Sequence, residues 1–332
     1  MLIQLIKVHD AVHDRISRIL RRKRKMENNK IEIVGIDHGW SNMKTTNSVF
    51  TSGVKEITTE PALFDNVVEF EGKYFKVGGK RLEVKDTKVT DENYYILTLA
   101  SIGKELSRRG LRRANVLLSV GLPLTRFGAE KKDFIDYLMK RKEISFKFEN
   151  VRYNVIIERV SVFPQCYAAV ADRLGSFRRE VLVVDIGSWT VDIMPISNQK
   201  PDIEQCVTLP KGLITCMRAI NEQCVRQLGG QVTEADIQEV MMCGRSDIAT
   251  KYLDVIQEGI TEFARSIYFS LKEYGYNLET MPIIFVGGGA TVMKLFGNIK
   301  QGDIKYIEDV KANAKGFEYL ARVFLATNKR VG

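Results

Sequence analysis

The sequence of 332 residues is 45% hydrophobic and 27% charged, a composition that excludes a disordered, collagen-like or disulfide-scaffold protein. At roughly 150 residues per domain, this length predicts two domains. The longest stretch without a charged residue, 280–293, has 14 residues, and a membrane-spanning helix needs about 18 or more, so no integral membrane segment is expected.

Charge and cysteine content narrow the class of protein further. Of the net charge of +9, +6 comes from residues 1–30, and the other 302 residues are nearly neutral. A nearly neutral body predicts no broad surface for direct nucleic-acid binding. The five cysteines include no C-x-x-C pair, which favours reduced thiols in a cytoplasm over a disulfide or zinc framework.

Residues 1–25 have apolar positions at helical spacing, followed by the basic run 21–25. This pattern is typical of an amphipathic membrane-surface helix or of a nucleic-acid-binding arm. The interpretation we favour is that Met26 is the true start, because the residues after it lead directly into the first strand. His9 and His13 are four residues apart, as zinc ligands on a helix can be, but no third ligand accompanies them, so no metal is expected there.

From residue 31 the pattern is α/β. Strands are predicted over 31–37, 44–51, 70–77 and 114–122, and 145–157 is predicted as a strand or hairpin. Helices are predicted over 94–109 and 127–141, and a further helix is expected to begin at Pro164, since proline is favoured in a first turn. The polar stretch 173–180 breaks the pattern and is the best candidate for a linker between two domains.

The second half of the chain repeats the α/β pattern. Strands are predicted over 181–185, 190–196, 203–209 and 283–286. Helices are predicted over 213–228, 234–242, 252–274 and 310–326. The alternation predicts two α/β domains, each built on a mixed sheet.

The candidate phosphate-binding residues lie in a weak internal repeat. Residues 37–44 and 185–192 both begin with Asp-x-Gly at the end of an apolar strand, 148 residues apart, and both lead into a returning strand. Glycine lets backbone N–H groups approach an anion closely, so two such turns facing each other would form a phosphate clamp. Asp37 and Asp185 would then hold Mg²⁺ through water, and Lys44 would offset phosphate charge. Each turn alone is equally typical of an ordinary β-hairpin.

A third glycine-rich element follows the strand predicted at 283–286. Gly287, Gly288 and Gly289 would let a base or a phosphate rest on bare backbone, although a tight strand-to-helix turn is the simpler interpretation. No Walker P-loop occurs, and the three glycines do not complete a G-x-G-x-x-G motif. Nucleotide binding therefore requires another architecture.

The order of these motifs, with Pro164-Gln165 between the two turns, resembles the actin/sugar-kinase/chaperone ATPase superfamily, and within it the bacterial ParM/StbA plasmid-segregation ATPases. The segment 312–316, Ala-Asn-Ala-Lys-Gly, resembles the family's second connecting segment, where small residues let helices cross closely. The resemblance implies two actin-like (ribonuclease H-like) domains with a nucleotide cleft between them. Domain I would comprise 31–176 and a returning helix at 309–330, and domain II would comprise 177–308, with 1–30 as a basic extension.

The resemblance also implies roles for single residues. Gln165 matches the residue that positions the attacking water, and Trp40 stands where relatives often have a small hydroxyl residue. The first phosphate loop would be formed by Asp37, Gly39, Ser41, Asn42 and Lys44, and the second by Asp185, Gly187, Ser188, Thr190 and Asp192. The adenine and ribose would contact Gly287, Gly288 and Gly289. Lys211 and Gly212 would form a further contact with the nucleotide.

The implied function is that of a cytoplasmic ATPase that uses ATP and Mg²⁺, self-assembles into filaments and moves plasmid or mobile-element DNA. Such a protein reaches DNA through an adaptor bound at a centromere-like site. A phosphotransferase of the sugar-kinase type is the first alternative, but it needs a carboxylate to take a proton, and Gln165 cannot do so. The second alternative is a non-polymerising ATPase scaffold of the chaperone or cell-division type, whose substrate-binding extension or membrane-tethering helix is not recognised.

Overall fold

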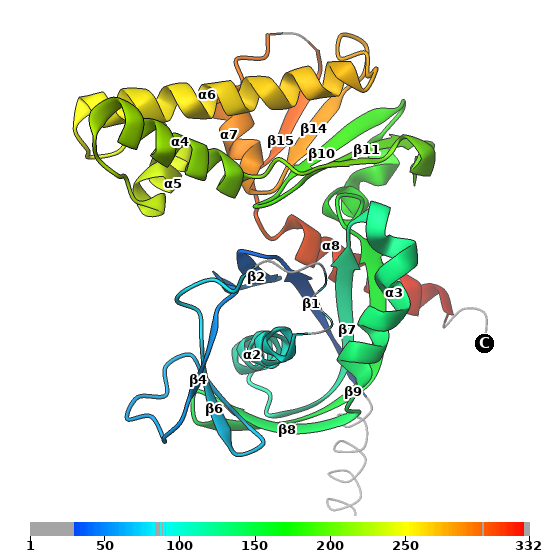
Figure 1. Cartoon of the computed structure of the whole chain (residues 1–332). Helices are drawn as coiled ribbons and strands as arrows, with labels where there is room; N and C mark the ends of the chain where they lie inside the picture. The colour runs from blue at the N-terminus through cyan, green and yellow to red at the C-terminus, as the bar shows by residue number, and fades with distance from the viewer. Residues whose placement is uncertain (1–29, 84–86, 88, 90, 301, 329–332) are drawn as a thin grey trace, which may run out of the picture.

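The computed structural model describes residues 30–83, 87, 89, 91–300 and 302–328, which fold around two mixed β-sheets with helices on their faces (Figure 1). This architecture confirms the predicted fold class. The basic run predicted at 21–25, together with His9 and His13, lies outside the described residues. Within those ranges, no helix has the length and apolar character that a membrane span requires.

The first sheet has nine strands. Strands β1 (Ile31–His38), β7 (Arg113–Leu122) and β9 (Val151–Pro164) run parallel to one another at its centre. Their apolar runs suit strands that are covered on both faces. Beside β1 lie β2 (Asn42–Thr45) and β3 (Val49–Thr51), and beyond β9 lie β8 (Glu143–Phe148), β5 (Val67–Phe70), β6 (Lys73–Val77) and β4 (Val54–Ile57).

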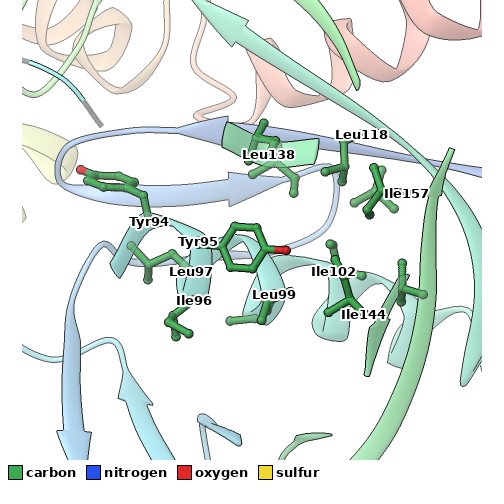
Figure 2. Close-up of a cluster of buried hydrophobic side chains, with 14 of the residues drawn as sticks. Tyr94, Tyr95, Ile96, Leu97, Leu99, Ile102, Leu118, Leu138, Ile144 and Ile157 are labelled. Carbon is green, nitrogen blue, oxygen red and sulfur yellow. The ribbon is translucent and has the colours of Figure 1, made fainter. Parts of the chain in front are cut away.

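Helix α2 (Glu92–Arg108) lies within the curve of this sheet (Figure 1). Between Tyr94 and Leu106 every side chain except that of Lys104 is buried, as expected for a helix covered on several sides. Each buried aliphatic side chain contributes about 1.5–3 kcal/mol to folding. Figure 2 shows residues of α2 packed with Leu118 of β7, Leu138 of α3 (Leu124–Met139), Ile144 of β8 and Ile157 of β9.

The second sheet has six strands. Strands β10 (Val181–Ile186), β14 (Ile283–Val286) and β15 (Ile304–Ile307) are parallel, and β11 (Val191–Ser197), β12 (Lys200–Pro201) and β13 (Val207–Leu209) add antiparallel pairs. Helices α4 (Leu213–Leu228), α5 (Glu234–Cys243), α6 (Thr250–Glu273) and α7 (Gly288–Phe296) gather on one side of it (Figure 1). The 3₁₀ helix η1 (Ala168–Ser176) packs on the opposite face.

Helix α8 (Ala312–Asn328) returns from the second sheet and packs on β1, β7 and η1. The hydroxyl of Ser119 donates to the carbonyl of Phe317 at 2.7 Å, and the N–H of Gly35 donates to Glu318 at 3.2 Å. A Cβ atom at Gly316 would overlap the carbonyl oxygen of Ala168, so helices α8 and η1 approach closely only because residue 316 is glycine. The domain boundaries 31–176, 177–308 and 309–330 stay a prediction.

The prediction that a helix begins at Pro164 is wrong. Pro164 is the last residue of β9, and the N–H of Gln165 still donates to the carbonyl of Leu122 at 2.9 Å. The ladder with β7 therefore outweighs the local preference of proline for a helix start. Helix η1 begins only at Ala168 and contains the first half of the predicted linker 173–180.

Several predicted strands are divided in the structure. The strand at 44–51 is a hairpin of β2 and β3, and the strand at 70–77 is a hairpin of β5 and β6 that turns at Glu71 and Gly72 with φ of 52° and 76°. The strand at 203–209 is a 3₁₀ turn, η2 (Ile203–Gln205), followed by β13. The short strands β4, β12 and β15 were not predicted, because two to four residues give too little alternation to recognise.

Candidate functional site

The two repeated turns stand at the carboxyl ends of β1 and β10. Asp37 and Asp185 are buried there, with 3% and 9% of their surfaces exposed. The first turn requires glycine, because a Cβ at Gly39 would overlap the carbonyl of Asn42. A Cβ at Gly187 would lie 3.2 Å from the carbonyl of Thr190, a tight contact that a shift of a few tenths of an ångström would relieve. The strands return as β2 and β11, paired antiparallel with β1 and β10. The predicted strand–turn–strand units are therefore confirmed.

Asp37 is the centre of the first group of polar side chains. Lys44 donates to its Oδ2 at 3.1 Å, and Nε2 of Gln165 donates to its Oδ1 at 3.0 Å. Burial lowers the pKa of Lys44, but the charges of Asp37 and Asp185 outweigh it and raise that pKa above its ordinary value. Lys44 therefore stays a cation, and Gln165 is held beside the first turn from 128 residues away.

Asp185 is the centre of the second group. Nδ2 of Asn313, on α8, donates to its Oδ2 at 2.7 Å. Burial and the charge of Asp192 raise the pKa of Asp185 to about 7, against the opposing effects of Lys44 and Asn313. Asp192, on β11, accepts a hydrogen bond from Thr208 at 2.6 Å, and burial raises its pKa to about 6. Asp185, whose pKa is raised, therefore lies between the charge of Lys44 and that of Asp192 in this group.

Asn313 is the residue of this group that sequence reasoning missed. It lies in the segment 312–316, which the sequence indicates only as a run of small residues between helices. An Asn among alanines and glycine at the start of a buried helix was the available signal, because a buried amide requires hydrogen-bond partners. Its Oδ1 accepts from the N–H of Cys166 at 3.0 Å, so both ends of the amide are satisfied.

The N-terminus of α4 holds the second turn in place. The N–H groups of Leu213 and Ile214 donate to the carbonyls of Gly187 and Ser188 at 3.1 and 2.9 Å. Because these bonds use two of the helix's first N–H groups, those groups are not available to a phosphate. Gly212 is required here, since a Cβ would overlap the backbone of Ser188.

The side chain of Lys211 points toward helix α6. Its Nζ donates to the hydroxyl of Ser270 on α6 at 3.2 Å. Lys211 borders a groove between α4 and α6, together with residues such as Thr215 and Gly259. It does not line the cavity that Trp40 and Ser188 border. A side-chain contact from Lys211 to a nucleotide in that cavity is therefore not part of this arrangement.

A cavity of about 980 Å³ opens between the two halves of the molecule. Predicted site residues from both turns and from the glycine run line it: Trp40, Ser41, Asn42, Ser188 and Gly288, together with Trp189. Asp37, Lys44, Gln165 and Asp185 are not among its lining residues. Trp40 packs edge-on against Tyr94 at 5.7 Å, and the guanidinium of Arg218 lies 5.0 Å from the ring of Trp189.

Two features of the cavity wall fit an anionic, flat ligand. The hydroxyl of Ser41 is buried and, among the residues that the structure describes, has no hydrogen-bond partner. A buried unsatisfied hydroxyl costs about 1–3 kcal/mol, which a ligand acceptor would recover. Gly287 is required by its φ of 78° and Gly289 by its approach to Ile186, whereas a Cβ at Gly288 would meet only ordinary contacts. Gly288 therefore leaves bare backbone facing the cavity.

An ion pair crosses from one half of the molecule to the other beside this cavity. Nη2 of Arg81, in the loop after β6, donates to both carboxylate oxygens of Glu234 at 2.7 Å each. Glu234 is the first residue of α5, and both residues line the cavity. The pair therefore links the two walls of the cavity directly.

Two family models match the chain. The model described as the N-terminal domain of actin-like proteins matches residues 35–167, and the model described as the C-terminal domain of the archaeal MreB-like actin homologue matches residues 183–296. A search against curated protein sequences finds no match.

The fold is similar to that of several solved structures. The ADP complex of Ta0583, an archaeal actin homologue, is 20% identical with a TM-score of 0.70, covering 89% of this chain and 100% of that chain. A 15-stranded ParM filament from Clostridium botulinum is 18% identical with a TM-score of 0.69, covering 89% and 100%. Bacillus thuringiensis ParM with AMPPNP is 12% identical with a TM-score of 0.65, covering 90% and 99%. At these identities the likeness establishes a shared fold.

Proposed function

Since the chain belongs to the actin-like proteins, we propose that it binds ATP with Mg²⁺ between its two sheets, hydrolyses it, and assembles into filaments that segregate plasmid or mobile-element DNA. The observation that carries this proposal is the convergence of both Asp-x-Gly turns, Lys44 and Gln165 beside one cavity. Residues that lie 128 apart in sequence are brought to hydrogen-bond distance there. Such convergence is what a phosphate clamp requires.

In this proposal the two turns hold the phosphates from opposite sides. Ser41 supplies a hydroxyl that no described residue engages in a hydrogen bond, and Ser188 supplies the second wall. Gly288 provides a bare surface for the base or ribose. Lys44, held as a cation by Asp37 and Asp185, offsets negative charge on the phosphates.

Asp37 and Asp185 would hold Mg²⁺ through water, because carboxylate oxygens suit this ion. No cluster of three or more His, Cys, Asp or Glu side chains forms a metal cage in the described part of the chain. Two carboxylates still fit, since Mg²⁺ usually keeps several waters and takes further ligands from substrate phosphates. When bound, the ion would neutralise charge that develops on the phosphates.

The amide of Gln165 supports hydrolysis over transfer to a substrate hydroxyl. A glutamine neither gains nor loses a proton near pH 7, so it can orient a water but cannot deprotonate an alcohol. Its donor end is held by Asp37 at 3.0 Å, which limits the positions of its carbonyl oxygen. A water-positioning residue fixed in this way is what an ATPase of this fold needs.

Filament formation follows from how a nucleotide would set the angle between the two halves. A ligand clamped by both turns favours one interdomain angle, which a subunit interface can recognise. The likeness to a ParM filament supports self-assembly. We place this activity in the cytoplasm. A DNA-binding adaptor at a centromere-like site is part of the proposal, because residues 31–332 are nearly neutral in net charge.

The proposal is tested by sedimentation and electron microscopy with ATP·Mg²⁺, ADP·Mg²⁺ or no nucleotide. ATP should drive filaments above a critical concentration, and phosphate release should accompany assembly. A protein that hydrolyses ATP yet stays monomeric at tens of micromolar, under varied salt and crowding, would contradict the filament role. A protein that phosphorylates a small hydroxyl compound instead would favour the sugar-kinase alternative.

A further inference from the structure

Helix α8 brings a polar side chain between the two groups of the candidate site. Asn313, its second residue, is buried, with 8% of its surface exposed. Its Nδ2 donates to Oδ2 of Asp185 at 2.7 Å, and its Oδ1 accepts from the N–H of Cys166 at 3.0 Å. One amide therefore joins the end of β10 to the turn that follows β9.

That turn, which carries Gln165, has an unusual backbone angle at the next residue, Cys166. Cys166 has a φ of 66°, and the N–H of Tyr167 donates to the carbonyl of Gln165 at 2.7 Å, which closes a three-residue turn. A positive φ at the centre of such a turn is rare for a residue with a side chain and costs about 1–3 kcal/mol. The conformation persists only because neighbours hold it, and the bond from Cys166 to Asn313 is one of these restraints.

The same amide selects one oxygen of Asp185. Asn313 occupies Oδ2, whereas Oδ1 accepts no hydrogen bond from any described residue. Oδ1 lies beside Gly287, where a Cβ atom would stand 2.8 Å away. Asn313 therefore fixes the rotamer of the carboxylate so that Oδ1 is left for a water.

We propose that Asn313 is a positioning residue that orients Asp185 and the turn carrying Gln165 relative to each other. An amide suits this role because it donates from one end and accepts at the other, which neither an ionised Asp nor an Ala can do. The inference rests on the proposed function, since Asn313 acts only through Asp185 and Gln165.

Two substitutions separate the two bonds. Asn313→Ala removes both, and Asn313→Asp keeps an acceptor for Cys166 while it places a second carboxylate against Asp185. For each we expect single-turnover ATP hydrolysis to slow by about 10–100-fold, while ATP affinity by calorimetry changes by less than about threefold. Without nucleotide, amide hydrogen exchange at Cys166 should be faster in Asn313→Ala than in Asn313→Asp.

Ser119→Ala is the matched control. Ser119 is also buried and also bonds to α8, through the carbonyl of Phe317 at 2.7 Å, but it does not touch the site. Its loss should destabilise the protein by a similar mechanism and leave turnover unchanged. Should Asn313→Ala not fold, Asn313→Asp carries the same turnover measurement.

The double variant Asn313→Ala/Gln165→Ala tests whether Asn313 acts through Gln165. Its loss of turnover should be smaller than the product of the two single losses, because the substitutions disable a shared step. Wild-type turnover in Asn313→Ala, or losses that multiply fully, would overturn the positioning role. If the unmodified protein fails to hydrolyse ATP, the proposed function fails first, before any substitution is made, and the positioning role fails with it.

Discussion

The ion pair between Arg81 and Glu234 should slow the release of bound nucleotide. It joins the two walls of the cavity across 153 residues of sequence, with both distances at 2.7 Å. A motion that separated these two walls would break the pair. Arg81→Ala is the cleaner perturbation, because Glu234 also stands in the first turn of α5, where an acidic residue stabilises the helix.

The size of the effect follows from exposure. The side chains of Arg81 and Glu234 are 26% and 44% exposed, so solvent screens the attraction. Such pairs contribute about 0.2–1 kcal/mol, and two short contacts to one carboxylate place this pair in the upper part of that range. A change of about 1 kcal/mol in the open–closed equilibrium corresponds to roughly a fivefold change in rate, if nucleotide leaves only from the open form.

Stopped-flow release of a fluorescent ATP analogue, measured at low and high salt, tests this. Arg81→Ala should release the analogue about two- to fivefold faster at low salt, and the difference should shrink as salt screens the pair. The control is Lys73→Ala, which removes an exposed ion pair with Glu56 at 3.1 Å inside the first sheet. Equal release rates in Arg81→Ala and the unmodified protein at low salt would refute the reasoning.

Three further predictions follow from the site. Gln165→Ala should slow ATP hydrolysis by about 10–1000-fold at a similar affinity for ATP, and ATP filaments should last longer. An unchanged rate of phosphate release would show that Gln165 has no part in the mechanism. Trp40 and Trp189 both line the cavity, so the intrinsic fluorescence of the protein should change with added ATP·Mg²⁺ until binding saturates. Replacing each tryptophan singly with Phe should show how much of the change comes from each. Saturable ATP binding by calorimetry with constant emission would contradict the placement of both turns at the nucleotide. The pKa of Asp192 is raised to about 6, so the folded state binds its proton more tightly than the unfolded chain, and its contribution to the free energy of unfolding falls as pH rises from about 4 to 7. Asp192→Asn should therefore stabilise the protein by about 2 kcal/mol at pH 7.5 and by little at pH 4.5 in urea unfolding, and equal gains at both pH values would count against the assignment.

The turns at Asp37 and Asp185 are structures that neighbouring residues alone were sufficient to predict. Each combines an apolar run, an aspartate and a glycine within ten residues, and each folds as the predicted strand–turn–strand unit. The segment 145–157 was expected to be a strand or a hairpin, and it lies in the hairpin of β8 and β9, which turns at Glu149 and Asn150 with φ of 51° and 61°. Asn tolerates such an angle but Glu ordinarily does not, so the alternation along 145–157, and not the residues of the turn, was the signal for this hairpin.

Sequence alone therefore determined the longer strands and helices and the order of the turns, because alternation, helical periodicity and glycine act over a few neighbouring residues. Only the tertiary structure decided that Pro164 ends a strand, that Lys211 turns toward Ser270, and that Asn313 bonds to Asp185. Each outcome depends on a contact with a distant segment, and Asn313 and Asp185, 128 positions apart, carry no local sign of their pairing. A buried hydrogen bond stabilises the fold only when both partners are removed from water together. The packing of α8 against β1, β7 and η1, and not the composition of 312–316, therefore placed this amide in the site.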